Sequence, residues 1–387
     1  MKPNWTLVRQ QFPMLKQNLV YLDNAALVQK PQMVIDGIVD FYTKHAVSNR
    51  TSDTVLGIAT EQIVLQTRQK LAQLLNVDWT EVFFNSGTTE GLNYSAQLLA
   101  QFVNPGDQIL VSPYNHTSHI VPWVELAKLK KAKVVFSENF LKDLNEKTKI
   151  ICYTQINNNF NHSVDLATLR IKALEVGALI VNDAAQAISH EVVDGQLADI
   201  IAFSVNKFFG PTGLGVLYVN QKLLAQMQPK KYGGGSIQSL AKDGSWTANS
   251  QYFSQHEPGT LNLAGIFGLN KALDFFMSFS IKAIQDYLFE LSTYAYDQLK
   301  QLEQVKIHSK RGDFIVLFEI KNIPSQDVSS YLGHRNIYIR SGWFCAKYLE
   351  HLIDKPLLRV SFQIYNNKSD IDQLCDHLKN GGHFIDV

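Results

Sequence analysis

The chain has 387 residues, of which 45% are hydrophobic, and its 36 Lys and Arg residues nearly balance its 35 Asp and Glu residues. A chain of this length exceeds one comfortable core, so we expect one large and one smaller domain. The formal net charge of +1 at pH 7 argues against a nucleic-acid or membrane-surface partner and favours a small ligand.

Three cysteines, Cys152, Cys345 and Cys375, lie far apart and form no Cys-x-x-Cys pair. This spacing argues against a disulfide framework or a structural zinc site, and we expect no metal. No apolar stretch reaches the roughly 18 residues of a membrane span. The first residues, Met1 to Thr6, carry no apolar signal region, so the sequence favours a cytoplasmic protein.

The first elements in chain order are a short strand and two helices. Tyr21 to Ala26 reads as a strand that runs into a turn of small residues, which leaves room for a ligand. Apolar residues at helical spacing predict helices over 34–42 and 60–75. Asn49 to Ser52 forms a polar loop between these helices.

An alternation of strand, turn and amphipathic helix begins at Glu81 and predicts an α/β sheet with parallel content. Several of its strands are apolar throughout and therefore covered on both faces. In such sheets ligands bind at the carboxyl ends of the strands. The predicted strands are 82–85, 108–111, 133–136, 149–153, 178–181, 200–203 and 214–219, with helices through Leu99 and near 120–129.

The pattern changes beyond Leu263, where a long helical region extends through Leu302 and is followed by strands and a final helix at 369–378. This pattern predicts a separate α+β domain with strands at 314–320, 337–340 and 357–362. The run Gly233 to Ser236 reads as a flexible loop near a site. We therefore divide the chain into an N-terminal segment (1–20) that packs on the small domain, a large α/β domain (21–265) and a small α+β domain (266–387).

Small and hydroxyl residues, Ser86 to Gly91, separate the strand at 82–85 from a predicted helix. Free main-chain N–H groups at the start of that helix, together with the hydroxyls of Thr88 and Thr89, suit a phosphate group. An ordinary helix N-cap in the capping-box style is the alternative interpretation.

Two histidines, His116 and His119, follow the strand at 108–111. Their spacing would suit a metal, but no third ligand cluster is evident. Stacking on a flat ring or moving a proton is the better expectation for a histidine at a strand end. A solvated loop histidine is the remaining alternative.

Amides follow the strand at 149–153, and a carboxylate follows the strand at 178–181. The amides of Asn157 to Asn159 can hydrogen-bond a ring substituent, although a polar turn would have the same composition. Asp183 stands between an apolar strand and small residues, where an unpaired carboxylate is costly to bury. It therefore needs a cationic partner, unless it only caps a local turn.

Lys207 follows the apolar strand at 200–203 and precedes a turn that contains Gly210 and Pro211. Taken alone it reads as a solvated loop lysine. The alternative is a desolvated lysine of lowered pKa that forms a Schiff base with a carbonyl cofactor. Pyridoxal phosphate needs such a lysine, an acid for its ring nitrogen, a phosphate anchor and a stacking residue. Because the other strand ends supply these groups, the second interpretation is favoured.

Several motifs in collinear order resemble the class V aminotransferase family of fold-type I pyridoxal phosphate enzymes, and most of all its SUF-type cysteine desulfurases. The similarity runs from about Tyr21 to the C-terminal helix. It implies a large domain with a mostly parallel seven-stranded sheet and a smaller α+β domain that carries a nucleophilic cysteine. The motifs are Tyr-Leu-Asp-Asn-Ala-Ala (21–26), Gly-Thr-Thr-Glu-Gly (87–91), His-x-x-x-Ile-Val-Pro-Trp (116–123), Asp-Ala-Ala-Gln-Ala (183–187), Ser-Val-Asn-Lys-Phe-Phe-Gly-Pro-Thr-Gly (204–213), Gly-Gly-Gly-Ser (233–236) and Arg-Ser-Gly-Trp-Phe-Cys-Ala (340–346).

The resemblance implies a role for each matching residue. Lys207 would hold pyridoxal 5'-phosphate, Asp183 would pair with its ring nitrogen, and His116 would stack on the ring. Family members are homodimers, and Thr260 matches the residue that reaches the phosphate of the partner subunit. The remaining matches are Asn158 and Gln186 near the ring oxygen; Thr88, Thr89, Ser204 and Asn206 at the phosphate; and Asn24, Ala25, Arg340 and Arg359 at the substrate, with Arg359 binding its carboxylate.

The implied reaction converts L-cysteine to L-alanine and leaves the sulfur on Cys345 as a persulfide, for an acceptor protein in iron–sulfur cluster or thio-cofactor assembly. His116 and Lys207 would assist, and a half-buried structural cysteine is the alternative for Cys345. Trp343-Phe344 stands where the group usually has His-His, so activation of Cys345 is expected to differ. Other functions left open are a selenocysteine lyase, a cysteine sulfinate lyase or another class V lyase, and a non-catalytic scaffold.

Overall fold

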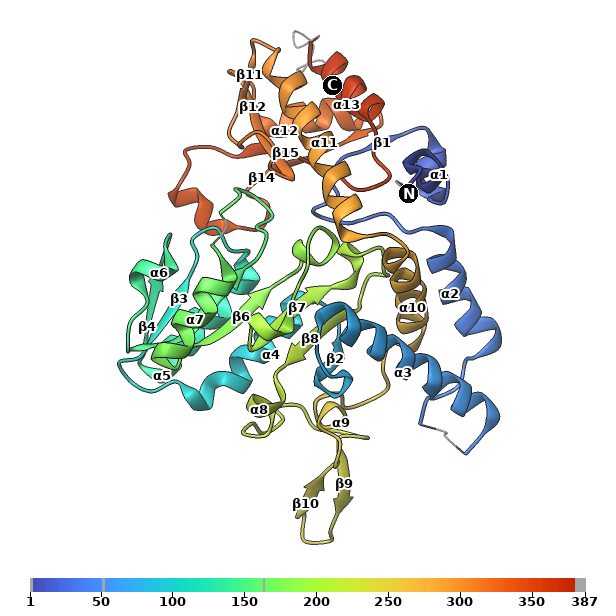
Figure 1. The fold of residues 1–387 in the computed structure, drawn as a ribbon, viewed down its shortest axis with the longest axis vertical. Coiled ribbons are helices and arrows are strands. Elements are labelled where there is room, and N and C mark those ends of the chain that lie inside the picture. Colours follow the sequence, from blue (N-terminus) through green and yellow to red (C-terminus); the bar gives the residue numbers. More distant parts are fainter. Residues whose placement is uncertain (1–2, 51–52, 163, 380–387) are drawn as a thin grey trace.

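The computed structural model describes residues 3–50, 53–162 and 164–379, so Thr51 and Ser52 of the expected polar loop, and the ends of the N-terminal segment and small domain, lie outside the described residues. Its centre is a seven-stranded sheet of order β2-β8-β7-β6-β5-β3-β4 (Figure 1). Only β8 runs antiparallel to its neighbours, which confirms the expected, mostly parallel α/β class. The strands are β2 (Val82–Asn85), β3 (Gln108–Val111), β4 (Lys133–Phe136), β5 (Thr148–Thr154), β6 (Leu179–Asp183), β7 (Ile200–Ser204) and β8 (Gly215–Val219).

Both faces of this sheet are buried, because successive residues of its strands enter different hydrophobic clusters. In β5, Ile150 and Cys152 belong to the cluster that contains Trp123, whereas Ile151 and Tyr153 belong to the other. This two-residue period explains why the strands read as apolar throughout. The covering helices of this part are α4 (Thr88–Leu99), α5 (Val121–Lys130), α6 (Phe140–Asp143), α7 (Leu166–Val176) and α8 (Gln221–Leu224).

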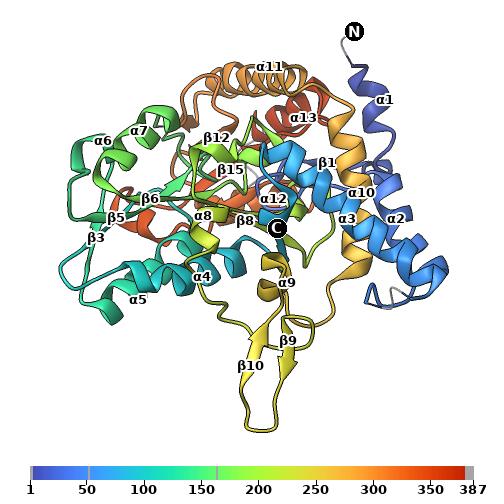
Figure 2. The ribbon, with the colours of Figure 1, turned by 60° about the horizontal axis from the view of Figure 1, so that its bottom comes forward.

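A group of three helices, α2 (Gln32–Lys44), α3 (Val55–Leu75) and α10 (Leu263–Met277), packs beside the sheet (Figures 1 and 2). The approach of α2 to α10 depends on glycine, since a Cβ on Gly37 would lie 3.0 Å from the carbonyl oxygen of Phe267. The long helical region expected through Leu302 is two helices, because Ser280 caps a new helix, α11 (Ile281–Lys300), by accepting from the N–H of Ala283.

A second sheet, of order β11-β12-β15-β14, lies at the end of the molecule that also holds α11, α12 and α13 (Figure 1). The expected strand at 337–340 is divided, because β13 leaves this sheet and pairs in parallel with β1 near the N-terminus. The elements are β1 (Val20–Tyr21), β11 (Val305–Ile307), β12 (Ile315–Ile320), α12 (Ser325–Gly333), β13 (Ile337–Tyr338), β14 (Arg340–Gly342), β15 (Leu357–Ser361) and α13 (Lys368–Lys379).

The N-terminal segment contacts the helices of this second region. In α1 (Trp5–Arg9), the guanidinium of Arg9 lies 2.9 Å from the carboxylate of Asp370 in α13. The ring of Trp5 stacks on Tyr287 of α11 with centroids 4.8 Å apart. The domain boundaries at 20/21 and 265/266 remain predictions.

A hairpin of β9 (Ile237–Leu240) and β10 (Trp246–Ala248) projects from the body, next to α9 (Tyr252–His256) (Figure 2). The only expectation for this region was a flexible loop at 233–236. The strands were missed because they bury no face on their own, and Leu240 and Trp246 are exposed. Among the described helices, none combines the length and apolarity needed to cross a bilayer.

Candidate active site

A cavity of about 160 Å³ lies at the carboxyl ends of β5, β6 and β7 and at the start of α4. Nine residues that the sequence singled out line this cavity together. A larger cavity, of about 350 Å³, lies on the other side of the 155–161 loop, but its lining contains no lysine. The nine residues are Thr88, Thr89, His116, Asn158, Asp183, Gln186, Ser204, Asn206 and Lys207.

Asp183 ends β6 and its side chain is almost fully buried, with 4% of the residue exposed. One carboxylate oxygen accepts a hydrogen bond from the main-chain N–H of Ala185 at 3.0 Å. Within residues 3–50, 53–162 and 164–379, no cationic side chain forms an ion pair with it. Burial raises the pKa of Asp183, and the charges of His116 and Lys207 oppose that rise. A buried carboxylate that lines a cavity in this way fits a cationic ring nitrogen.

His116 is held by its own loop, since its Nδ1 accepts a hydrogen bond from the N–H of Ser118 at 3.1 Å. Burial is the main cause that lowers the pKa of His116, while the Asp183 charge opposes it. A neutral imidazole lining the cavity suits a stacking role. The second histidine, His119, is fully buried: its Nε2 contacts the carbonyl oxygens of Tyr153 and Val181, and its Nδ1 accepts from the indole N–H of Trp123. Both nitrogens of His119 are therefore occupied.

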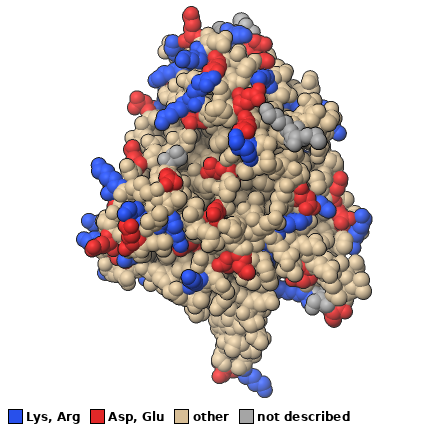
Figure 3. Space-filling model, in the orientation of Figure 1, with Lys and Arg blue, Asp and Glu red and all other residues tan. Residues whose placement is uncertain are grey.

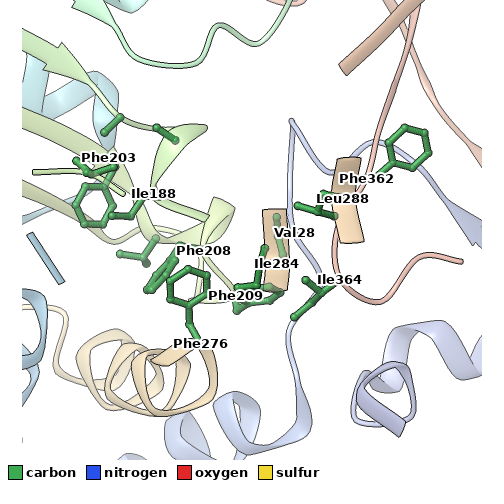
Figure 4. Packing of buried hydrophobic residues seen from close by; sticks show 14 of the residues in the cluster. Val28, Ile188, Phe203, Phe208, Phe209, Phe276, Ile284, Leu288, Phe362 and Ile364 are labelled. Atoms are coloured by element: carbon green, nitrogen blue, oxygen red, sulfur yellow. The ribbon is translucent and has the colours of Figure 1, made fainter. Parts of the chain in front are cut away.

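Lys207 lies in a single 3-10 turn that follows β7. The next residues, Phe208 and Phe209, are fully buried and pack on α10, with the Phe208 and Phe276 rings 4.6 Å apart (Figure 4). The end of this turn requires glycine at position 210, because a Cβ on Gly210 would lie 2.9 Å from the Val205 side chain. The aromatic pair thus anchors the segment in the core. Burial lowers the pKa of Lys207, against the pull of Asp183, so the amine is easier to deprotonate.

The start of α4 forms the opposite end of the cavity. No side chain caps the N-cap residue Gly87, whereas the Ser204 hydroxyl accepts from the N–H of Thr88 at 2.7 Å. The hydroxyls of Thr89 and Ser118 lie 2.8 Å apart. Hydroxyls gathered around a helix start suit an anion, since the helix dipole places positive charge there.

These residues fit pyridoxal phosphate. The buried carboxylate of Asp183, which has no ion-pair partner among the described residues, matches its ring nitrogen, the hydroxyls around Gly87 match its phosphate, and Lys207 matches its aldehyde. The described residues contain no group of three His, Cys, Asp or Glu side chains arranged to hold a metal ion.

Arg359 lies on β15 beside the cavity with only 2% of the residue exposed. Its Nη2 is 2.7 Å from the Asp23 carboxylate, and its Nη1 donates to the carbonyl oxygen of Asn158 at 2.9 Å. Its Nε has no partner among the described residues. Burial lowers the pKa of Arg359 while Asp23 raises it. The guanidinium is fixed in direction by the bonds to Asp23 and Asn158, and its remaining N–H donors, among them the unpartnered Nε–H, are left for an acid.

Cys345 is exposed and lies in a tight turn between β14 and the 3-10 helix at 347–351. The N–H of Ala346 donates to the carbonyl oxygen of Trp343 at 2.8 Å, and Phe344 and Cys345 between them have φ values of 53° and 58°. This is the pattern of a type I′ turn, which normally contains Gly, Asn or Asp. Left-handed backbone costs of order 1–3 kcal/mol at each such residue, so surrounding contacts must hold the turn.

The ring of Phe344 supplies one of those contacts. It is 4% exposed, packs in a cluster with Ala25 and Leu357, and lies 4.9 Å from the Arg359 guanidinium. Cation–π attraction therefore joins the turn to the arginine. The aromatic side chain of Phe344 thus has a packing role here.

The other expected substrate residues do not line the 160 Å³ cavity. The amide of Asn24 donates to the carbonyl of Ser361 at 2.6 Å and to Asn366, and Ala25 bonds Ser361 and Gln186 through its main chain. Arg340 is exposed and pairs in register with Arg359. The geometry therefore gives Asn24 and Ala25 a supporting position next to the cavity.

Thr260 lines a different cavity, which also contains Lys231 and His256. The loop before it is held by Glu257, whose carboxylate pairs with Arg68 at 2.9 Å and also accepts from the main-chain N–H of Phe84 in β2. Arg50 donates to the carbonyl oxygen of Gly259 at 2.6 Å. The loop is ordered, and Thr260 does not reach the cavity of its own chain.

Sequence reasoning missed four residues that line the cavity. It also missed Asp23, which holds Arg359, and Thr117, which holds the Cys345 turn. Asp23 was passed over within a recognised motif, although a carboxylate after a short strand could have been inspected like Asp183. No sequence signal indicates the hydrogen bonds between Thr117 and Cys345, because they join distant segments. The missed lining residues are Ser118, Thr154, Ile156 and Ala185.

Comparison with known proteins places this geometry in a family. The aminotransferase class-V family matches residues 20–374. A probable cysteine desulfurase of Ureaplasma parvum serovar 3 is 34% identical over 388 residues, which cover 96% of each chain. A cysteine desulfurase of Serratia proteamaculans is 34% identical over 398 residues, which cover 96% of this chain and 97% of that protein.

Two solved structures of cysteine desulfurases are also similar to this chain. The crystal structure of the cysteine desulfurase CsdA from Escherichia coli has a TM-score of 0.92 and 31% identity, and the match covers 98% of this chain and 99% of that one. The cysteine desulfurase from Thermococcus onnurineus NA1 gives a TM-score of 0.89 at 26% identity and covers 96% of both chains. With a match that spans nearly all of its length, the chain belongs to the aminotransferase class-V family.

Proposed function

We propose that the protein is a cysteine desulfurase that uses pyridoxal 5'-phosphate to convert L-cysteine to L-alanine and transfers the sulfur to Cys345. The observation that carries the proposal is the placement of an exposed thiol next to the cavity. Thr117, which directly follows His116, donates its N–H and its hydroxyl to the Cys345 carbonyl at 2.9 and 2.7 Å. The relatives named cysteine desulfurase support the same reaction.

Each of the nine predicted cavity residues has a defined task in this proposal. Lys207 holds the cofactor and, when freed, removes the substrate Cα proton, which its lowered pKa favours. Asp183 keeps the ring nitrogen protonated, and His116 covers the ring. The phosphate is held by Thr88, Thr89, Ser204 and Asn206, while Asn158 and Gln186 lie near the ring oxygen. Bound pyridoxal phosphate supplies an electron sink for the Cα carbon.

Arg359 binds the substrate carboxylate through the donors that Asp23 and Asn158 leave free. Arg340, Asn24 and Ala25 form the outer part of this end of the site. The Cys345 thiolate attacks the substrate sulfur, so an S–S bond forms as the C–S bond breaks, and alanine is released. Lys207 and Arg359 both lie within electrostatic range of Cys345.

Mass spectrometry after incubation with L-cysteine tests the proposal. We expect a persulfide on the peptide that contains Cys345 and stoichiometric alanine under single turnover. Cys345→Ser should keep the cofactor and lose alanine release by at least about a hundredfold, because it lacks the sulfur nucleophile. The control is Cys375→Ser, since Cys375 is buried in α13.

Undiminished alanine release by Cys345→Ser would remove Cys345 from the mechanism. If the wild-type protein released alanine from selenocysteine or cysteine sulfinate but not from cysteine, and Cys345→Ser kept that activity, the protein would be a lyase for those substrates, because both leaving groups depart without a thiol nucleophile.

The exposed position of Cys345 also supports delivery of the sulfur to an acceptor protein for iron–sulfur cluster or thio-cofactor assembly. All three cysteines are free, which suits a reducing compartment and a cytoplasmic location. Cell fractionation tests the location.

We further infer that the protein is a homodimer whose sites lie at the subunit interface. The β9–β10 hairpin carries charge mainly at its tip (Figure 3), and its Leu240 and Trp246 side chains are 67% and 42% exposed. Exposed apolar side chains of this size mark interaction surfaces. The Thr260 loop does not line the cavity of its own chain, which leaves it available to the partner's phosphate site.

Sedimentation velocity at micromolar concentration should give a single species of twice the 43.7 kDa chain mass. A Trp246→Ser, Leu240→Ser double variant should shift the population toward monomer, whereas a purely monomeric parent protein would contradict the inference.

A further inference from the structure

The turn that carries Cys345 lacks the residues that would stabilise it by itself. Its two central positions, Phe344 and Cys345, have positive φ values and are neither glycine nor asparagine. Its closing bond, from the N–H of Ala346 to the carbonyl oxygen of Trp343, is the ordinary one for such a turn. The direction of the thiol therefore depends on contacts from outside the turn.

Thr117 makes the most extensive of these contacts. Its main-chain N–H and its hydroxyl both donate to the carbonyl oxygen of Cys345, at 2.9 and 2.7 Å. The hydroxyl oxygen also accepts from the main-chain N–H of Lys347 at 3.3 Å. One side chain thus holds the main chain on both sides of Ala346.

A second contact comes from Asn158, whose side-chain amide donates to the carbonyl oxygen of Phe344 at 2.7 Å. Asn158 lines the cofactor cavity, and its own carbonyl accepts from Arg359. Thr117 follows His116, which lines the same cavity. Both contacts therefore start from walls of the cavity and reach across to the turn.

We propose that Thr117 is the positioning residue for the nucleophile, because it fixes the main chain of Cys345, and so the direction of its thiol, relative to the cofactor cavity. This inference rests on the proposed role of Cys345 in sulfur transfer. Asn158 assists by holding the preceding carbonyl. Loss of the Thr117 hydroxyl leaves cofactor and substrate binding intact and slows only the step in which Cys345 attacks sulfur.

The test compares Thr117→Val with Thr117→Ser. Valine keeps the branched shape and the main-chain N–H but removes the hydroxyl, whereas serine keeps the hydroxyl. Hydrogen exchange of the Lys347 amide is a direct readout, since the Thr117 hydroxyl is its acceptor. We expect exchange about tenfold faster in Thr117→Val and near wild type in Thr117→Ser, the effect of about one lost hydrogen bond.

Kinetics give the second readout. For Thr117→Val we expect persulfide formation on Cys345 to slow about tenfold, with an unchanged KM for L-cysteine and unchanged near-visible absorbance of the cofactor. Thr117→Ser should restore the rate. The matched control is Thr43→Val, which removes an exposed hydroxyl bonded to the carbonyl of Val39 in α2.

Wild-type exchange and wild-type persulfide formation in Thr117→Val would overturn the positioning role. Equal losses in Thr117→Val and Thr117→Ser would also overturn it, because the hydroxyl would then not be the active element. Absence of any Cys345 persulfide in the wild-type protein would instead refute the proposed function, together with the inference that depends on it.

Discussion

The cofactor cavity and the Cys345 turn differ in how they are held. The cavity is built where strands of one sheet end, and it is anchored in the core: Asp183 is 4% exposed, and Phe208 beside Lys207 is fully buried. The turn is exposed, has left-handed backbone at two residues, and depends on hydrogen bonds from Thr117 and Asn158.

This difference separates two kinds of chemical task. Holding a cofactor requires charged groups that are fixed in position and shielded from water. The ends of buried strands supply such positions, because the core already holds them. A sulfur carrier must reach the substrate and then present its sulfur to another protein, so it lies on an exposed segment. The turn obtains its order from the cavity walls and not from its own sequence.

The largest effect is expected from Lys207→Ala. Since the lysine is the covalent anchor of the cofactor, we expect complete loss of the near-visible absorbance and of alanine formation, by a factor of at least about 10⁴. The fold should remain, because Phe208 and Phe209 anchor the segment. Absorbance spectra measure the bound cofactor, and circular dichroism measures the fold. The control is Lys222→Ala, at an exposed position of α8.

If Lys207→Ala kept the near-visible band, another amine would hold the cofactor. Lys30 would then be the group to examine, because burial lowers its pKa to about 7. The cavity would then depend on a neighbouring segment for its main function, as the Cys345 turn does. The two regions would no longer differ in how they are held.

A smaller effect is expected in the pH dependence of the free energy of unfolding, through the buried His119. Burial lowers the pKa of His119 to about 4, from an ordinary value near 6.5. Because the folded-state pKa is depressed, the neutral ring contributes stability that is fully present above pH 6.5 and is lost as pH falls toward 4. We expect this group to reduce the free energy of unfolding by about 1 kcal/mol per pH unit in that window.

Urea unfolding at several pH values measures the slope. His119→Gln cannot titrate there and should show a flatter dependence, although it is less stable at pH 7. An unchanged slope in this variant would mean that His119 does not titrate on unfolding. His256, whose pKa burial also lowers to about 4, provides a second group of the same kind.

The fold was predicted largely from the sequence, because its strands are short apolar runs between turn signals. The strand at 108–111 has the predicted bounds, and the one at 200–203 differs by one residue. The failures have physical causes. The hairpin at 237–248 buries no face of its own, and the helical run beyond Leu263 is divided by the Ser280 cap, which the apolar spacing did not reveal.

Much of the candidate site was also predicted. Asp183 was singled out because an aspartate directly after a buried strand is costly without a partner. Lys207 alone reads as a solvated loop lysine, and it was favoured because the other strand ends supply the remaining groups that the cofactor needs. Thr117 was not predicted, since a half-buried threonine at the start of a turn has many harmless explanations and its partner lies 228 positions away in sequence. The role of Phe344 also required the structure, which places its ring on Arg359.

The bond between Glu257 and the main-chain N–H of Phe84 has a consequence for how the protein behaves in a crowded solution. Strand β2 is the outer strand of the seven-stranded sheet, and free N–H groups on such a strand invite pairing with another chain. The carboxylate of Glu257, itself balanced by Arg68, occupies one of those donors. The Glu257 carboxylate therefore opposes pairing of β2 with a strand of another molecule, and the aggregation that would follow.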